Sequence, residues 1–300
     1  MWQYILLSFG LFLSACPTFA QQHTVKSDTI PFTLTVHNNL VIQGVLNNSD
    51  TVNLMFHTAA DAITLIQDAT ENMSSINWNA VDTVGSWGGQ QAARFSESNT
   101  LQIGAFTWDS QPIWENEYSG PTTDGKFGPN LFENQVIEIN FDKKIIIIHE
   151  TLPQYCETYE KLDLLFENGF MFIVGKSQVG EETFENRFLI HSGYSGAILY
   201  DDQFVETSKI GDHLEIISEN ELKDSYGNIL KTKKAILPLF ELGNISLLNI
   251  PVGFFEGAIG RQKMSVLGGD VLKRFNIIID SDRTHIYLKE NTLIDLPDRQ

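Results

Sequence analysis

The stretch "FGPNLFENQVIEINFDKKIIIIHE", residues 127–150, occurs a second time in altered form as "LGGDVLKRFNIIIDSDRTHIYLKE", residues 267–290. The two align without a gap, and most unmatched pairs are conservative. Self-similarity at a fixed offset indicates a repeated structural unit. We therefore predict two equivalent halves. The identical residues of the alignment are Gly128–Gly268, Ile137–Ile277, Ile139–Ile279, Asp142–Asp282, Ile146–Ile286 and Glu150–Glu290.

The similarity continues upstream of this stretch. "IGAFTWDSQPI" matches "LGNISLLNIPV", "SWGG" resembles "SYGN", and "LMFHTAADAITL" matches "FLIHSGYSGAIL". The last match places His57 on His191. We predict one lobe over residues 21–156 and a second over residues 157–300, with the polar, Pro-containing "ETLPQYCETYEK" between them.

Short apolar runs such as "LVIQGVL", "VNLMFH" and "VIEINFD" alternate with Gly, Asn, Asp and Ser along the whole chain. Runs of this length, bounded by turn-forming residues, are typical of β-strands. Only "DVLKRF" and "PNLFEN" suggest helices, one short turn in each half. The expected fold class is all-β, with two similar lobes and short helices.

The formal net charge is -18 over 300 residues. A chain this acidic repels nucleic acid and anionic membrane surfaces, so neither is an expected partner. With 42% hydrophobic residues the chain can bury a sizeable core. We expect a monomer.

Residues 1–20 are expected to be a signal peptide, because "YILLSFGLFLSAC" is a short apolar run that ends near "TFAQQ". The run lacks preceding Lys or Arg. "LSAC" also resembles a lipoprotein processing site, which would place a lipid anchor on Cys16. Either route predicts a periplasmic or secreted protein, in which Cys156 alone is unmodified and no intrachain disulfide forms. No later run is long enough to span a membrane.

The repeated motifs resemble those of aspartic proteases of the pepsin and retropepsin type, over nearly all of the mature chain. In that family each lobe carries an apolar-apolar-Asp-Thr/Ser-Gly loop, a β-hairpin flap and a later apolar-apolar-Gly motif. Here "MFHTAAD" and "LIHSGYSG" take the first place, "SWGG" and "SYGN" the second, and "GKFGPNLF" and "SVLGGDVL" the third. The resemblance implies two acid-protease-like β-barrel lobes.

At the positions of the family's two catalytic aspartates the sequence has His57 and His191, and Ala59 replaces the glycine of the first loop. The resemblance implies that Thr58 and Ser192 hydrogen-bond across the lobes and lock them together. It implies a substrate-binding role for Asp61, whose alternative is a turn cap. The remaining expected ligand contacts are Gly193 of the second loop and the flap aromatics Trp87 and Tyr226, which alternatively pack on their own hairpins.

Two facing imidazoles change the chemistry of such a site. Two cationic rings about 4 Å apart repel by roughly 4 kcal/mol at an effective dielectric of about 20, so acid proteolysis has no obvious route. Each neutral ring also offers one acceptor nitrogen only.

Three functions remain open: a pseudoprotease that binds an extended peptide between the lobes, a hydrolase that uses the His57–His191 pair, and a metal-binding protein that uses the same two side chains. No cofactor is expected. His149 and His285 are expected at exposed strand positions.

Overall fold

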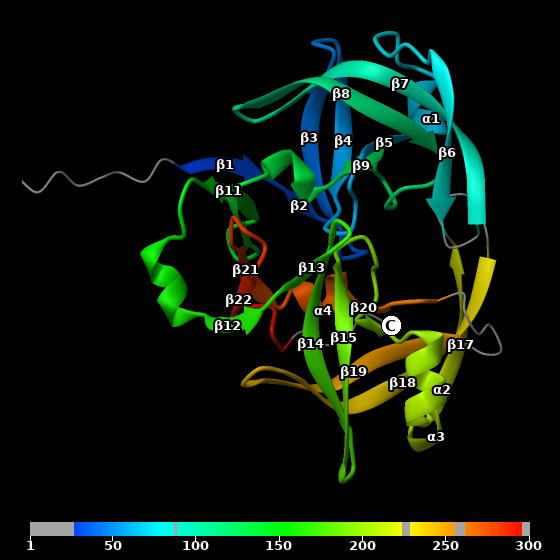
Figure 1. The fold of residues 1–300 in the computed structure, drawn as a ribbon, viewed down its shortest axis with the longest axis vertical. Helices are drawn as coiled ribbons and strands as arrows, with labels where there is room; N and C mark the ends of the chain where they lie inside the picture. Colours follow the sequence, from blue (N-terminus) through cyan, green and yellow to red (C-terminus); the bar gives the residue numbers. More distant parts are fainter. Residues whose placement is uncertain (1–26, 87–88, 224–228, 256–261, 296–300) are drawn as a thin grey trace, which may run out of the picture.

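The computed structural model describes residues 27–86, 89–223, 229–255 and 262–295 (Figure 1). Most of these residues form strands, in one six-stranded sheet and two eight-stranded sheets. The all-β class and the duplicated arrangement predicted from the sequence are confirmed. Within the described residues, no helix has the length and apolar character needed to cross a membrane.

The six-stranded sheet joins the two halves. Its order is β1-β11-β10-β21-β22-β12, from β1 (Ser27–Pro31), β11 (Ile145–His149), β10 (Val136–Asn140), β21 (Phe275–Ile279), β22 (His285–Glu290) and β12 (Glu160–Asp163). The runs "IIIIH" and "FNIII" favour strands because β-branched side chains suit a pleated, buried surface. Both faces of β10 and β21 are buried.

The register at the centre of this sheet demonstrates the duplication. In the β10–β21 pair Ile137 lies opposite Ile279, and Ile139 lies opposite Ile277. The sequence repeat aligns Ile137 with Ile277 and Ile139 with Ile279, so the equivalent residues exchange partners. Such reciprocal pairing is the mark of a twofold relation.

Each lobe forms a closed ring of strands. In the first lobe the ring β3-β4-β9-β5-β8-β7 is closed by β3–β7 pairing, and β2 and β6 extend it. These strands are β2 (Thr33–Leu34), β3 (Leu40–Leu46), β4 (Asp50–Phe56), β5 (Ile63–Ile66), β6 (Ala80–Ser86), β7 (Gly89–Ile103), β8 (Phe106–Asn116) and β9 (Gly125–Phe127).

The second lobe repeats this arrangement. Its ring β14-β15-β20-β16-β19-β18 is closed by β14–β18 pairing, and β13 and β17 extend it. These strands are β13 (Leu165–Glu167), β14 (Phe170–Val179), β15 (Glu182–His191), β16 (Ile198–Leu199), β17 (Ile216–Lys223), β18 (Ile229–Leu242), β19 (Ile245–Phe255) and β20 (Ser265–Gly268).

Equivalent turns share a backbone conformation. Gly104 and Gly243, which the repeat aligns, lie in two-residue hairpin turns and have φ of 57° and 59°. A left-handed residue in such a turn matches the twist of the flanking strands, and glycine adopts it without steric cost.

The helices are short, as expected. η1 (Pro129–Phe132) and α4 (Gly269–Leu272) follow β9 and β20, at the two places where the sequence suggested them. The others are α1 (Gln67–Thr70), η2 (Gln154–Thr158), α2 (Asp202–Ser208) and α3 (Ile210–His213).

Candidate functional site

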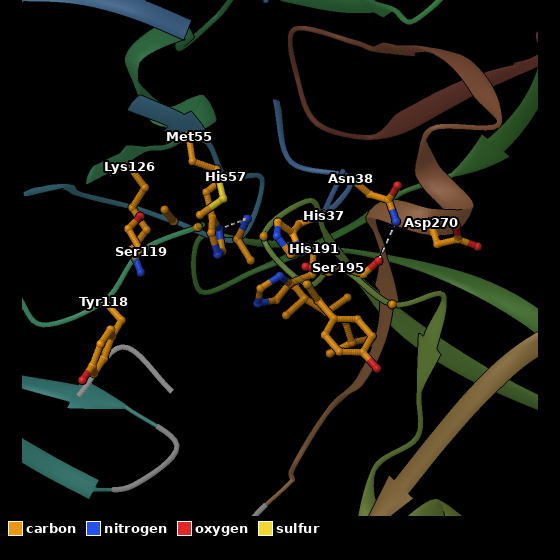
Figure 2. Close-up of a pocket in the computed structure, with 18 of the residues that line it drawn as sticks. His37, Asn38, Met55, His57, Tyr118, Ser119, Lys126, His191, Ser195 and Asp270 are labelled. Carbon is orange, nitrogen blue, oxygen red and sulfur yellow. Dashed lines mark hydrogen bonds between the residues drawn. The ribbon is translucent and has the colours of Figure 1, made fainter. Parts of the chain in front are cut away.

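Two equivalent strand ends bring His57 and His191 together where the lobes meet (Figure 2). His57 directly follows β4, and His191 is the last residue of β15. The strands β4 and β15 lie parallel to β9 and β20, which carry the later glycine motifs. The imidazole centroids are 4.5 Å apart, and the rings meet edge to face at 61°. The adjacency expected from the duplication is present.

Thr58 and Ser192 form reciprocal hydrogen bonds between the two loops. The Thr58 hydroxyl donates to the carbonyl of Ile190 at 2.7 Å and accepts from the Ser192 N–H at 2.9 Å. The Ser192 hydroxyl donates to the carbonyl of Phe56 at 2.7 Å and accepts from the Thr58 N–H at 3.0 Å. Both residues are buried, so these bonds supply partners that water cannot. Four hydrogen bonds therefore join the two loops through this pair.

The turn between β2 and β3 adds a second connection that the sequence did not indicate. Asn39 is fully buried, and its amide donates to the carbonyl of Ser192 at 3.1 Å. The amide of Asn38 donates to the carbonyl of Ser195 at 2.8 Å, and Lys273 Nζ donates to Asn38 Oδ1 at 3.0 Å. The second loop is therefore held by two separate segments of the first lobe.

The His57 ring has one polar and one close steric neighbour. The Ala59 N–H donates to Nδ1 of His57 at 3.2 Å, so the neutral ring carries its proton on Nε2. On the other side a Cβ atom at Gly193 would lie 2.2 Å from Cδ2 and 2.3 Å from Nε2 of His57. Only a glycine admits the ring in this position.

We expect Gly193→Ala to lower the free energy of unfolding by about 1–3 kcal/mol, because the new methyl group displaces a buried ring. In a protein that already carries His57→Ala, the substitution Gly193→Ala should cost much less, since the shortened side chain no longer meets the methyl group. Urea unfolding of the wild type, both single variants and the double variant measures the coupling. Purely additive losses would contradict the packing of His57 on Gly193.

Burial and like charge keep both histidines neutral. The pKa of His57 lies well below 6.5 because of burial first, then the charges of His191 and Lys126. Burial and then the charge of Lys126 lower the pKa of His191 to about 4. Burial also lowers the pKa of Lys126 to about 8, against the attraction of Asp61. At neutral pH the centre of the site therefore holds two uncharged imidazoles beside an ammonium group.

A cleft of about 1300 Å³ runs over this pair, with walls from both lobes. The first lobe contributes His57, Asp61 and Lys126, and the second contributes His191 and Gly193. Asp61 lies exposed in the cleft, and its backbone carbonyl accepts a hydrogen bond from Asn130 Nδ2 at 3.1 Å. Such a volume is on the scale of a ligand site rather than a packing defect.

Two flap hairpins were expected beside the cleft. β6 pairs with β7 as far as Ser86 and Gly89, and β17 pairs with β18 as far as Lys223 and Ile229. Hairpins therefore form at both expected places, and both extend toward the right side of Figure 1. Trp87 and Tyr226, like residues 1–20 with Cys16, lie outside the described residues.

No protein family description and no curated protein matches the sequence. The structure resembles the crystal structure of the aspartic proteinase from Irpex lacteus, with a TM-score of 0.62. The match covers 90% of this chain and 99% of that proteinase at 12% identity. The fold is that of a bilobed aspartic proteinase.

Lys126 is a further site residue that the sequence did not indicate. It lies in "GKFG", the later glycine motif of the first lobe. The apolar residues that follow this motif indicate core packing rather than a site residue. The available signal was the repeat itself, because it aligns Lys126 with the apolar Val266 of the second lobe.

The expectation that His149 is an exposed strand residue was wrong. His149 is buried, and its Nε2 lies 2.9 Å from Glu138 Oε2. The Tyr155 hydroxyl donates to the same carboxylate oxygen. η2 thus contributes to covering this part of the sheet, and the polar side chains there satisfy one another. His285 is half-buried beside Asp280, at 3.1 Å.

Within the described ranges, no three side chains of His, Cys, Asp or Glu gather into a metal-binding group. The thiol of Cys156 is buried and free.

Proposed function

We propose that this protein binds extended polypeptides in the interlobe cleft without cleaving them. The observation that carries the proposal is a neutral, tightly packed His57–His191 pair at the centre of an open cleft of about 1300 Å³. We take these histidines to occupy the places of the two catalytic carboxylates, and we infer that the protein acts outside the cytoplasm.

The chemistry of the dyad explains the loss of cleavage. Two carboxylates that share one proton activate a water and protonate the scissile carbonyl group. Here Nδ1 of His57 already accepts the Ala59 N–H, so it is not available as a base. Its Nε2 carries the proton and lies against Gly193. Burial disfavours the second proton that would make either ring cationic, so no imidazolium is present to act as the general acid.

The cleft nevertheless retains the features that bind a chain. The hydrogen bonds of Thr58 and Ser192 hold the lobes together, and the paired hairpins β6–β7 and β17–β18 flank the opening. Exposed backbone groups of strands recognise extended ligands by main-chain pairing. The fold therefore supports binding even where the central chemistry has changed.

Incubation of the mature protein with a random peptide mixture between about pH 3 and 8 tests this proposal. We expect the immobilised protein to retain peptides that mass spectrometry finds intact. His213→Ala, on a partly exposed side chain, serves as the control. Cleavage that is lost in His191→Ala but not in the control would instead establish a His-dependent hydrolase. Stoichiometric metal in untagged protein, lost in His57→Ala, would favour the metal-binding alternative.

A further inference from the structure

Lys126 presents its side chain to the cleft. It is the middle residue of β9, and its neighbour Phe127 is fully buried in the core with Phe56. Because successive side chains of a strand point to opposite faces, Lys126 faces away from that core. It lies opposite Met55 and Thr64 in the two flanking strands, and both of those residues also line the cleft. Figure 2 shows Lys126 beside Met55 on the side of His57 away from Asn38.

The fold does not require a cation at this position. The repeat aligns Lys126 with Val266, which also lines the cleft and is 1% exposed. An apolar side chain therefore satisfies the same strand position in the second lobe. Desolvating an ammonium group costs free energy, and the lowered pKa of Lys126, about 8, reflects that cost. A lysine at a place that suits valine therefore points to a ligand.

The charges around Lys126 leave a role for an anion. Asp61 is the carboxylate whose attraction raises the pKa of Lys126, and it lies exposed in the cleft. The other acidic groups in the lining are Asp82 and Asp270, and Asp270 is bonded to Lys273 and Arg274. The neighbouring imidazoles are neutral, so they contribute N–H donors rather than negative charge.

We propose that Lys126 forms a subsite for a carboxylate of the bound polypeptide, either an Asp or Glu side chain or a C-terminal carboxylate. This inference rests on the proposed function. Lys126 lies in one lobe only, and the equivalent Val266 offers an apolar wall in the other. A polypeptide with an acidic group would therefore bind in one direction and one register, with that group over the first-lobe half of the cleft.

Three pools of random peptides of equal length test the proposal. The first has Glu at a fixed central position and an amidated C-terminus, the second has Gln there and is amidated, and the third has Gln and a free C-terminus. We expect immobilised wild-type protein to retain the first or the third pool at least about tenfold better than the second, the low end for a close charge pair at an interface. The preferred pool identifies the source of the carboxylate.

Variants of the subsite separate charge from shape. Lys126→Met should remove the preference for peptides that carry the carboxylate. This variant should still fold, because the repeat accommodates valine at this place. Lys126→Arg should keep the preference. Asp61→Asn should increase it by removing the competing carboxylate. Lys176→Met, on an exposed side chain outside the cleft, loses the same charge and should change nothing.

The outcomes distinguish this inference from the proposed function. Equal retention of all three pools by the wild type would overturn the carboxylate subsite and leave polypeptide binding intact. A preference that survives in Lys126→Met would overturn it as well. Retention of no pool would contradict polypeptide binding itself, and the subsite with it.

Discussion

Replacing Thr58 by Val is expected to lower the free energy of unfolding by about 2–5 kcal/mol. The side chain of valine has nearly the shape of that of threonine, but it neither donates nor accepts hydrogen bonds. The substitution removes two buried hydrogen bonds, to the carbonyl of Ile190 and from the N–H of Ser192. Each of these backbone groups would lose a partner from the opposite lobe in a place that water does not reach, and an unsatisfied buried group costs about 1–3 kcal/mol.

Thr51→Val provides the matched control, because Thr51 lies on the same strand, β4, with its side chain exposed. Urea unfolding followed by tryptophan fluorescence measures both variants. A loss for Thr58→Val no larger than that for the control would show that the interlobe hydrogen bonds contribute little to stability. Ser192→Ala, which removes the reciprocal pair of bonds, should cost a similar amount.

The protein is expected to lose stability as the pH falls from 6.5 to 5. In the unfolded chain a histidine binds its proton near pH 6.5. In the folded protein His191 binds one only near pH 4, and the pKa of His57 is lowered too. The unfolded state therefore binds more protons than the folded state in this window. As a result, the free energy of unfolding decreases as the pH decreases.

The lowered pKa of His191 alone corresponds to about 2 kcal/mol between pH 6.5 and 5, and His57 adds to it in the same direction. Carboxylates titrate mostly below this window. His191→Gln, which cannot be protonated, should flatten the pH dependence there, while His213→Gln, on a partly exposed side chain, should leave it unchanged. Urea unfolding at half-unit pH steps provides the measurement. Stability that is constant over this window would show that the imidazoles are not shielded from solvent.

The architecture was predictable because the repeat encodes it locally. Alternating apolar residues and paired turn glycines specify strands and hairpins without reference to distant parts of the chain. The aligned isoleucines of residues 137–139 and 277–279 then pair with one another at the centre of the shared sheet. A sequence duplicated in this way specifies its own interface, since each copy presents the same edge to the other.

Parts of the site were predictable for the same reason, and others were not. The repeat places His57 on His191, and the structure brings the two rings to 4.5 Å. Asn39 lacks a counterpart in the quoted repeat, and its bond to Ser192 spans the two lobes. His149 is buried partly because η2 packs over this part of the sheet. The sequence pattern of β11 alone does not indicate that another segment covers it.

The sequence by itself determined the strands, the duplication and the identity of the two residues at the centre, because these follow from local pattern and from the equivalence of the copies. Only the tertiary structure decided their chemical state. Burial and the charge of Lys126 lower both pKa values and so keep the imidazoles neutral. Desolvation and Coulomb interactions depend on distances through space, and closure of the two lobes sets those distances.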